Sequence, residues 1–168
     1  MLVPGLLQTA EYTRALINGI NPGKSPHEVE RGVAARMARQ QILTREQQPA
    51  RLHAVLDQGV IERPVGRAVV MRAQLRRLID LAEYPNIVIQ VVPRQVGAYP
   101  GLEGPFSILS LPEPVPAFGY TEGMGGSVYL EKPEDIDRCT SRFALLTELA
   151  LSPDETIELI RDTAKDYQ

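Results

Sequence analysis

The stretch from Asn86 to Glu131 constrains the fold most, because it holds four short runs with the composition of β-strands. The first, Ile87–Val92, is almost continuously apolar and rich in β-branched residues, which is typical of a strand covered on both faces. The other three runs follow a long segment that contains glycine and proline, and they are Phe106–Leu111, Ala117–Thr121 and Ser127–Leu130. The last two are separated by EGMGG, whose three glycines permit a tight turn. We therefore expect a small, mainly antiparallel sheet with one long loop.

Helical periodicity is found on both sides of this stretch. Apolar spacing predicts a helix over residues 4–18 that ends at Gly19. Ser25, followed by Pro26 and Glu28, has the pattern of a capping box and predicts a second helix to about residue 47. After the sheet, Pro133 begins a helix through residue 149, and the sequence SPDE at 152–155 is a second capping box that begins the last helix.

A strand–helix–strand unit leads into the sheet. Leu52–Asp57 has a strand pattern, and Arg67–Glu83 carries an apolar stripe at helical spacing. This order predicts a right-handed crossover, with Leu52–Asp57 parallel to Ile87–Val92. The expected fold class is α+β: a mixed sheet of about five strands covered by N-terminal and C-terminal helices. We expect one domain over 1–168, with N-terminal helices at 4–48, the sheet core at 51–131 and a C-terminal helix pair at 133–167. The residues expected in the core are Leu75, Ile79, Ile89, Val91, Ile108, Phe143 and Leu146.

Composition excludes several classes of function. The chain has 168 residues with a net charge of −3, which argues against direct binding of nucleic acid by this chain alone. Its apolar runs are too short for a membrane span, and its N-terminus lacks the pattern of a secretory signal. Its single cysteine, Cys139, has no internal partner for a disulfide. We therefore expect a cytoplasmic protein with no membrane association.

The sequence carries no strong catalytic signature. His27, His53 and Cys139 are widely spaced, so we expect no metal site. No phosphate-binding glycine loop is present, and we expect no cofactor. His53 lies inside a predicted strand, where a structural histidine is the simpler interpretation.

Aromatic residues near the predicted sheet suggest a binding site. Aromatic walls with a few polar groups are typical of small-molecule pockets. The loop Val96–Gly104 combines three glycines with Pro100, and we interpret it as a lid over that site. The residues expected around one cavity are Tyr99, Phe106, Tyr120, Glu122, Arg63 and Gln74. Two alternatives remain open at this point: the aromatic residues cap the core, and Glu122 forms a salt bridge with an arginine rather than receiving a ligand.

Eight motifs, in order along the chain, resemble one family of regulators. They are VPGLLQTAEYTRAL at 3–16, ARMARQQIL at 35–43, VMRAQLRRL at 70–78, VIQVVP at 88–93, GPFSIL at 104–109, YTEG at 120–123, VYLEKPEDI at 128–136 and ALSPDET at 150–156. The chain resembles the C-terminal domain of unknown function that follows an Xre-type helix-turn-helix in actinobacterial regulators of the WhiJ-like, antitoxin-type group. The resemblance covers essentially the whole chain.

The resemblance implies a sensing or protein-interaction domain of a transcriptional regulator. Its expected partner is a small protein encoded nearby or a small-molecule ligand. A homodimer of the chain is a further alternative. The DNA-binding domain is absent from this sequence, so the chain is either an excised fragment or a stand-alone version. The alternative function is a stand-alone enzyme that uses the same fold and pocket in specialised metabolism. The family usually has an acidic residue followed by a small one where this chain has Gln58-Gly59, and this departure implies a changed specificity.

Overall fold

The computed structural model describes residues 1–123 and 126–167. These residues form six α-helices, five strands and four short 3-10 turns in a mixed α and β architecture. The helices are α1 (Ala10–Ile20), α2 (Pro26–Gln40), α3 (Gln58–Glu62), α4 (Ala68–Ala82), α5 (Pro133–Leu149) and α6 (Pro153–Lys165). The strands are β1 (Leu52–Asp57), β2 (Ile87–Val92), β3 (Ser107–Leu109), β4 (Phe118–Gly123) and β5 (Gly126–Leu130). In the described part of the chain, no helix is both long and apolar enough to cross a membrane.

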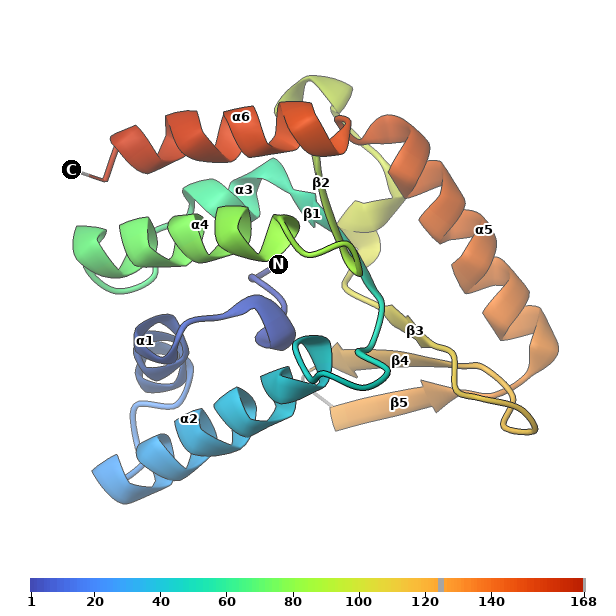
Figure 1. Cartoon of the computed structure of the whole chain (residues 1–168), viewed down its shortest axis with the longest axis horizontal. Helices are drawn as coiled ribbons and strands as arrows, with labels where there is room; N and C mark the ends of the chain where they lie inside the picture. Colours follow the sequence, from blue (N-terminus) through green and yellow to red (C-terminus); the bar gives the residue numbers. More distant parts are fainter. Residues whose placement is uncertain (124–125, 168) are drawn as a thin grey trace.

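The strand–helix–strand unit forms as its sequence predicts. β1 and β2 pair in parallel, from Leu52 opposite Ile87 to Asp57 opposite Val92, and α3 and α4 form the crossover. Helix α6 packs against α4, so both helices lie on the same side of the strand pair (Figure 1). This unit contains most of the buried core.

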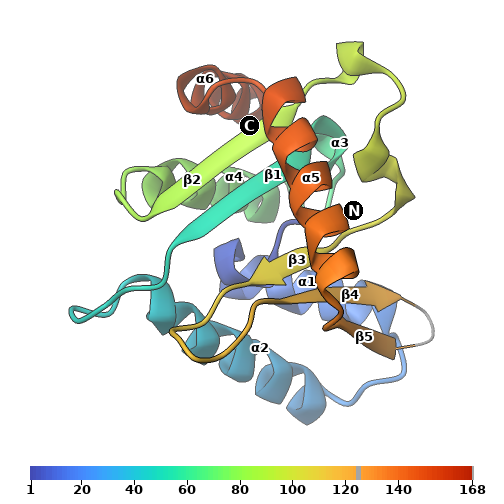
Figure 2. The ribbon, with the colours of Figure 1, turned by 90° about the vertical axis from the view of Figure 1, so that its right-hand side faces the viewer.

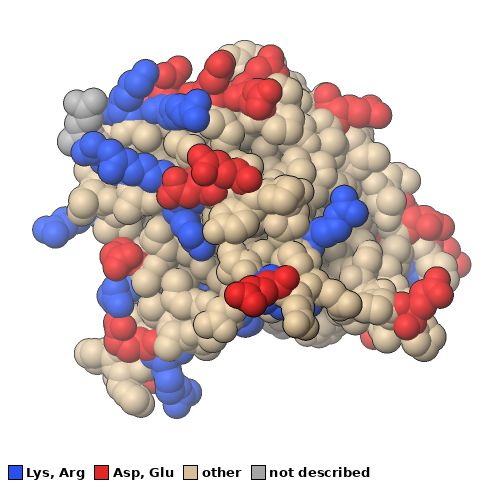
Figure 3. Space-filling view, viewed as in Figure 1, with Lys and Arg blue, Asp and Glu red and all other residues tan. Residues whose placement is uncertain are grey.

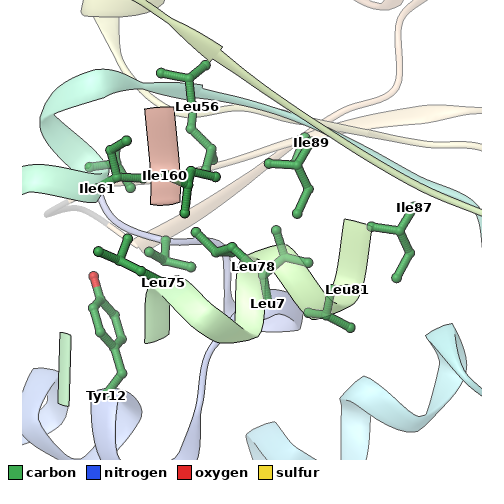
Figure 4. Packing of buried hydrophobic residues seen from close by; sticks show 14 of the residues in the cluster. Leu7, Tyr12, Leu56, Ile61, Leu75, Leu78, Leu81, Ile87, Ile89 and Ile160 are labelled. Carbon is green, nitrogen blue, oxygen red and sulfur yellow. The ribbon is translucent and has the colours of Figure 1, made fainter. Parts of the chain in front are cut away.

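The core is filled by large aliphatic side chains from the two strands and three helices. Figure 4 shows Leu56 and Ile89 from the strands close to Leu78 of α4, with Ile160 of α6 beside them. These residues are at most 4% exposed. Burial of apolar area of this kind supplies most of the favourable free energy of folding. Four of the predicted core residues are buried, namely Leu75, Ile89, Val91 and Leu146, whereas Ile79, Ile108 and Phe143 are only half-buried.

The prediction of one mixed sheet is wrong, because the strands form two separate sheets. One sheet is the parallel pair β1–β2, and the other is antiparallel with the order β3–β4–β5. Figure 2 shows the second sheet between α5 on one side and the α1–α2 pair on the other. The two middle residues of the predicted EGMGG turn, Met124 and Gly125, lie outside the described residues.

The free edge of β2 is occupied, which explains the division into two sheets. The backbone N–H of Leu151 donates to the carbonyl of Val91 at 2.9 Å. The N–H of Val91 donates to the hydroxyl of Thr156 at 3.0 Å. The connection between α5 and α6 therefore uses the hydrogen-bonding groups that a neighbouring strand would need.

The N-terminal helices differ from their prediction in length. The segment expected as one helix over 4–18 contains a 3-10 turn at Gly5–Leu7 and then α1, which begins after the N-cap Thr9 and continues through Gly19. The capping box at Ser25 is confirmed, but α2 ends at Gln40. The capping box at Ser152, which begins α6, is confirmed as well.

Candidate functional site

One face of the antiparallel sheet carries a cluster of aromatic side chains. Tyr120 on β4 is paired with Tyr129 on β5, and paired residues of antiparallel strands project from the same face. Their ring centroids are 5.3 Å apart, and Phe118 lies 5.9 Å from Tyr129. Tyr129 is 60% exposed although it belongs to this cluster. The aromatic cluster therefore presents a large apolar side chain to solvent.

Two predicted site residues, Tyr120 and Glu122, contact each other on this face. The Tyr120 hydroxyl donates to the Glu122 carboxylate and lies 3.1 Å from the Ser127 hydroxyl. The hydrogen bond to Glu122 raises the pKa of Tyr120 above its ordinary value. The expected alternative, a salt bridge between Glu122 and an arginine, does not form within the described residues.

Arg36 of α2 is a basic residue that the charge of Glu122 influences. The guanidinium of Arg36 donates to the side-chain oxygen of Gln8 at 2.8 Å. Burial lowers the pKa of Arg36, and the charge of Glu122 partly opposes that decrease. The charge of Glu122, which accepts the hydroxyl of Tyr120, therefore also reaches an arginine of α2.

Strand β5 is the open edge of this sheet. In the part of the chain that the structure describes, β5 pairs only with β4. Val128 is 52% exposed, and the residues from Gly126 to Leu130 include no charged side chain and no proline. The opposite edge strand, β3, has only three residues and lies between Pro105 and Pro112. Short strands and flanking prolines protect sheet edges from pairing, and β5 lacks both protections.

We refer to β5 and the outward β4 side chains beside it as the β5 surface. Its residues are Phe118, Tyr120, Glu122, Ser127, Val128 and Tyr129.

A second group of polar residues lies at the carboxyl ends of the parallel strands. Asp57 accepts the N–H of Gly59 with Oδ1 at 2.8 Å and the hydroxyl of Tyr99 with Oδ2 at 2.8 Å. The first contact caps α3. A Cβ at Gly59 would lie 2.8 Å from Oδ1, so a larger residue there would displace the Asp57 carboxylate. Burial, and next the hydrogen bond to Asp57, raise the pKa of Tyr99 well above 10.0.

Arg94, which follows β2, completes this group. Its backbone N–H donates to the side-chain oxygen of Gln58 at 2.9 Å, and its guanidinium pairs with Glu62. The Gln58 amide donates to the same Glu62 at 2.6 Å. We call Asp57, Gln58, Glu62, Arg94 and Tyr99 the strand-end cluster. Ligands of open α/β sheets bind at this end of the strands, so the cluster is a reasonable position for a ligand.

The predicted lid loop is held down at two points. Tyr99 attaches it to the strand-end cluster, and Glu103 forms a salt bridge with Arg142 of α5 at 2.6 Å. Gly101 is buried under the ring of Tyr99, where a Cβ would collide with that ring. The loop is therefore closed against the strand ends in this structure.

The remaining predicted site residues have different surroundings. Phe106 is half-buried and immediately precedes β3, whereas Arg63 is exposed at the end of α3. Gln74 is fully buried, and its amide is used by the backbone: it accepts from the N–H of Thr9 and donates to the carbonyl of Leu7, both at 2.8 Å. Gln74 therefore joins α4 to the N-terminal segment through its side-chain amide. The structure places Tyr99 with Asp57 and Tyr120 with Glu122, and a single cavity shared by all six residues stays a prediction.

Sequence reasoning missed Asp57 and Arg36. Asp57 is the last residue of a predicted strand and comes two residues before Gly59, a pattern that indicates an N-cap and could have identified it. Arg36 has no such signal, because one arginine among several on α2 is indistinguishable from a solvated residue. No group of three or more His, Cys, Asp or Glu side chains suited to a metal ion occurs in residues 1–123 and 126–167.

Comparison with known families gives one match. A family model described as a domain of unknown function (DUF5753) matches residues 1–162. No curated protein and no solved structure matches the chain.

Proposed function

The chain belongs to the DUF5753 family of domains of unknown function, and from this premise we propose that it is a protein-interaction domain whose partner binds at the β5 surface. The observation that carries the proposal is an open sheet edge with exposed apolar side chains on both faces. Val128 and Tyr129 point to opposite sides of β5 and are 52% and 60% exposed. Monomeric proteins usually protect such an edge.

The proposed mode of binding is the addition of a strand. An extended segment of the partner would pair with the free backbone groups of β5, and its side chains would contact the aromatic face and Val128. Backbone hydrogen bonds would supply affinity, and the tyrosine hydroxyls with Glu122 would favour a partner that offers hydrogen-bond donors. The partner in this proposal is a polypeptide with an exposed strand.

The finer assignment follows from the eight motifs and rests on resemblance. We propose that the domain serves an actinobacterial Xre-type regulator of the antitoxin-like group. The partner is then the small protein encoded beside it. The family match over residues 1–162 supports the domain assignment, and the regulator role is the proposal.

The test is a binding measurement with the purified small protein encoded next to this chain. Val128→Lys and Tyr129→Lys place a charge on the free edge, so affinity should fall by about tenfold or more, whereas thermal stability should change little because both side chains are exposed. Ile20→Lys is the matched control, since Ile20 is 59% exposed on a different element, α1. Unchanged affinity in both β5 variants contradicts the proposal. Self-association of the chain that is lost in both variants identifies a second copy as the occupant instead.

The strand-end cluster favours a second candidate, the sensing of a small ligand. Asp57 is at the carboxyl end of β1, where such ligands bind, and the loop that carries Tyr99 closes over it. A ligand with a hydrogen-bond donor would compete with Tyr99 for Asp57. Because the chain has no tryptophan, its tyrosine fluorescence can report this displacement, and Tyr99→Phe is the control variant. A ligand that produces the same change in Tyr99→Phe does not act at this cluster.

A further inference from the structure

A groove between α4 and the start of α1 is lined by three arginines. Its volume is about 470 Å³, and it is lined by Thr9, Val69, Arg72, Ala73, Arg76, Arg77 and Asp80. We call the α4 members of this set the arginine face. The helix buries its opposite side in the core through residues such as Leu75 and Leu78, so the arginine face is directed outward.

The arginine face is a local positive region on a negatively charged chain. The net charge is −3, yet α4 contains three arginines and one acidic residue, Asp80. In residues 1–123 and 126–167, the salt bridges involve other basic residues, so Arg72, Arg76 and Arg77 have no carboxylate partner. Figure 3 shows Lys and Arg side chains gathered over the left-hand ends of α4 and α6.

The arginines of this face are spaced to contact side chains one turn apart on a partner helix. Arg72 and Arg76 are four residues apart and lie on the same side of α4. Val69 is 63% exposed at the position three residues before Arg72, and Ala73 lies between the two arginines in the groove. The surface thus has a small apolar centre with cationic groups along it. Its complement is a helix with a short apolar stripe flanked by carboxylates at i and i+4.

We propose that the arginine face docks an acidic amphipathic helix of a partner protein. Carboxylates of that helix would pair with Arg72 and Arg76, and its apolar side chains would cover Val69 and Ala73. Guanidinium groups suit this role, because their planar fork can bind a carboxylate through two hydrogen bonds.

The neighbouring charges favour an acidic peptide over nucleic acid. A second groove, on the other side of α4 toward α6, has three acidic residues in its lining, Glu83, Asp154 and Glu158, and one basic residue, Arg161. An extended phosphate backbone across α4 would approach these carboxylates, whereas a short helix fits within the arginine face. The exposed Val69 also has no partner on a phosphate backbone.

The docking of an acidic helix goes beyond the proposed function, because it uses no residue of the β5 surface. The two proposals can therefore fail separately. A variant of β5 such as Val128→Lys should leave binding at the arginine face unchanged.

The experiment uses a synthetic helical peptide with leucines along one stripe and glutamates flanking it at i and i+4. Added to the isotope-labelled full chain, it should shift the NMR signals of residues 69–77 more than those of β5. Arg72→Glu combined with Arg76→Glu should weaken binding by about tenfold, because each substitution replaces an attraction with a repulsion. Affinity should also fall as salt rises.

The matched control carries the same charge change on another helix. Arg31 and Arg39 are exposed on α2, so Arg31→Glu combined with Arg39→Glu should retain the affinity within about twofold. Circular dichroism of both double variants checks that the helices are intact. The NMR shifts of the unmodified chain locate the bound peptide independently of any variant. Three results overturn the proposal: no binding of the glutamate peptide, equal loss in both double variants, or tighter binding of a generic DNA duplex through residues 69–77.

Discussion

The hydroxyl of Tyr99 donates to Oδ2 of Asp57 at 2.8 Å, and the other oxygen of the same carboxylate caps α3. One side chain thus fixes both the first turn of a helix and the loop that crosses the strand ends. The residues concerned are 42 positions apart in the sequence. This relationship links the local chemistry of a helix start to the position of the predicted lid.

Asp57 should matter more for stability than Tyr99. Tyr99→Phe removes one hydrogen bond and should lower the free energy of unfolding by about 1 kcal/mol. Asp57→Ala removes the same bond and the cap of α3, so it should cost about 2 kcal/mol. Urea denaturation of both single variants and the double variant measures these losses. If the double variant is as unstable as the sum of the two single variants, the hydrogen bond contributes nothing.

Tyr99 should also make stability depend on pH at the alkaline end. Its pKa is raised in the folded chain, so the folded state favours the neutral phenol. The resulting stability is fully present below pH 10.0, the ordinary pKa of tyrosine, and is lost as pH rises above it. Wild type should therefore lose more stability than Tyr99→Phe as pH rises through that range. Equal losses in thermal melts of the two proteins would show that Tyr99 ionises freely in the fold.

Gln74 should be a structural residue rather than a binding residue. Gln74→Leu leaves the N–H of Thr9 and the carbonyl of Leu7 without their partners. A buried unpaired polar group costs about 1–3 kcal/mol, so the variant should lose about 3 kcal/mol in urea denaturation. Arg63→Ala is the control, because its side chain is exposed, and it should lose less than about 0.5 kcal/mol. A stable Gln74→Leu protein with altered binding would return Gln74 to the candidate site.

The capping box of α6 should make stability depend on pH at the acid end. The Glu155 carboxylate accepts from both the N–H and the hydroxyl of Ser152, and these bonds lower the pKa of Glu155 below 4.5. A lowered pKa contributes stability above pH 4.5, the ordinary value, and this contribution is lost as pH falls through the folded pKa. Glu155→Gln should therefore melt below wild type at pH 7 and approach it at about pH 3. A difference in melting temperature that stays constant with pH would show that the charge of Glu155 does not stabilise the cap.

The sequence predicted local structure more accurately than the arrangement of the sheets. β1 and β2 were predicted with their observed bounds, because a continuous apolar run beside an amphipathic helix specifies a parallel crossover. The division into two sheets was missed, since it depends on Leu151 and Thr156 occupying the edge of β2 from about 60 residues away in the chain. Periodicity carries no information about such long-range hydrogen bonds.

The candidate site shows the same limit. The contact between Tyr120 and Glu122 could be anticipated, because residues two apart on a strand share a face. The contact between Tyr99 and Asp57 could not, because it depends on how the loop after β2 folds back over β1. Gln74 was assigned to the site for its polarity, but a buried amide also pairs with backbone groups, as it does here.

Amide hydrogen exchange at β5 tests the central claim most directly. In the free chain, alternate amides of Gly126–Leu130 point away from β4 and should exchange rapidly, because no strand pairs with them. On addition of the proposed small-protein partner, these outward amides should exchange at least about tenfold more slowly, because an added strand protects them. Val128→Lys should abolish this protection, and Ile20→Lys should preserve it. Binding of the small protein with unchanged exchange across Gly126–Leu130 would contradict the account.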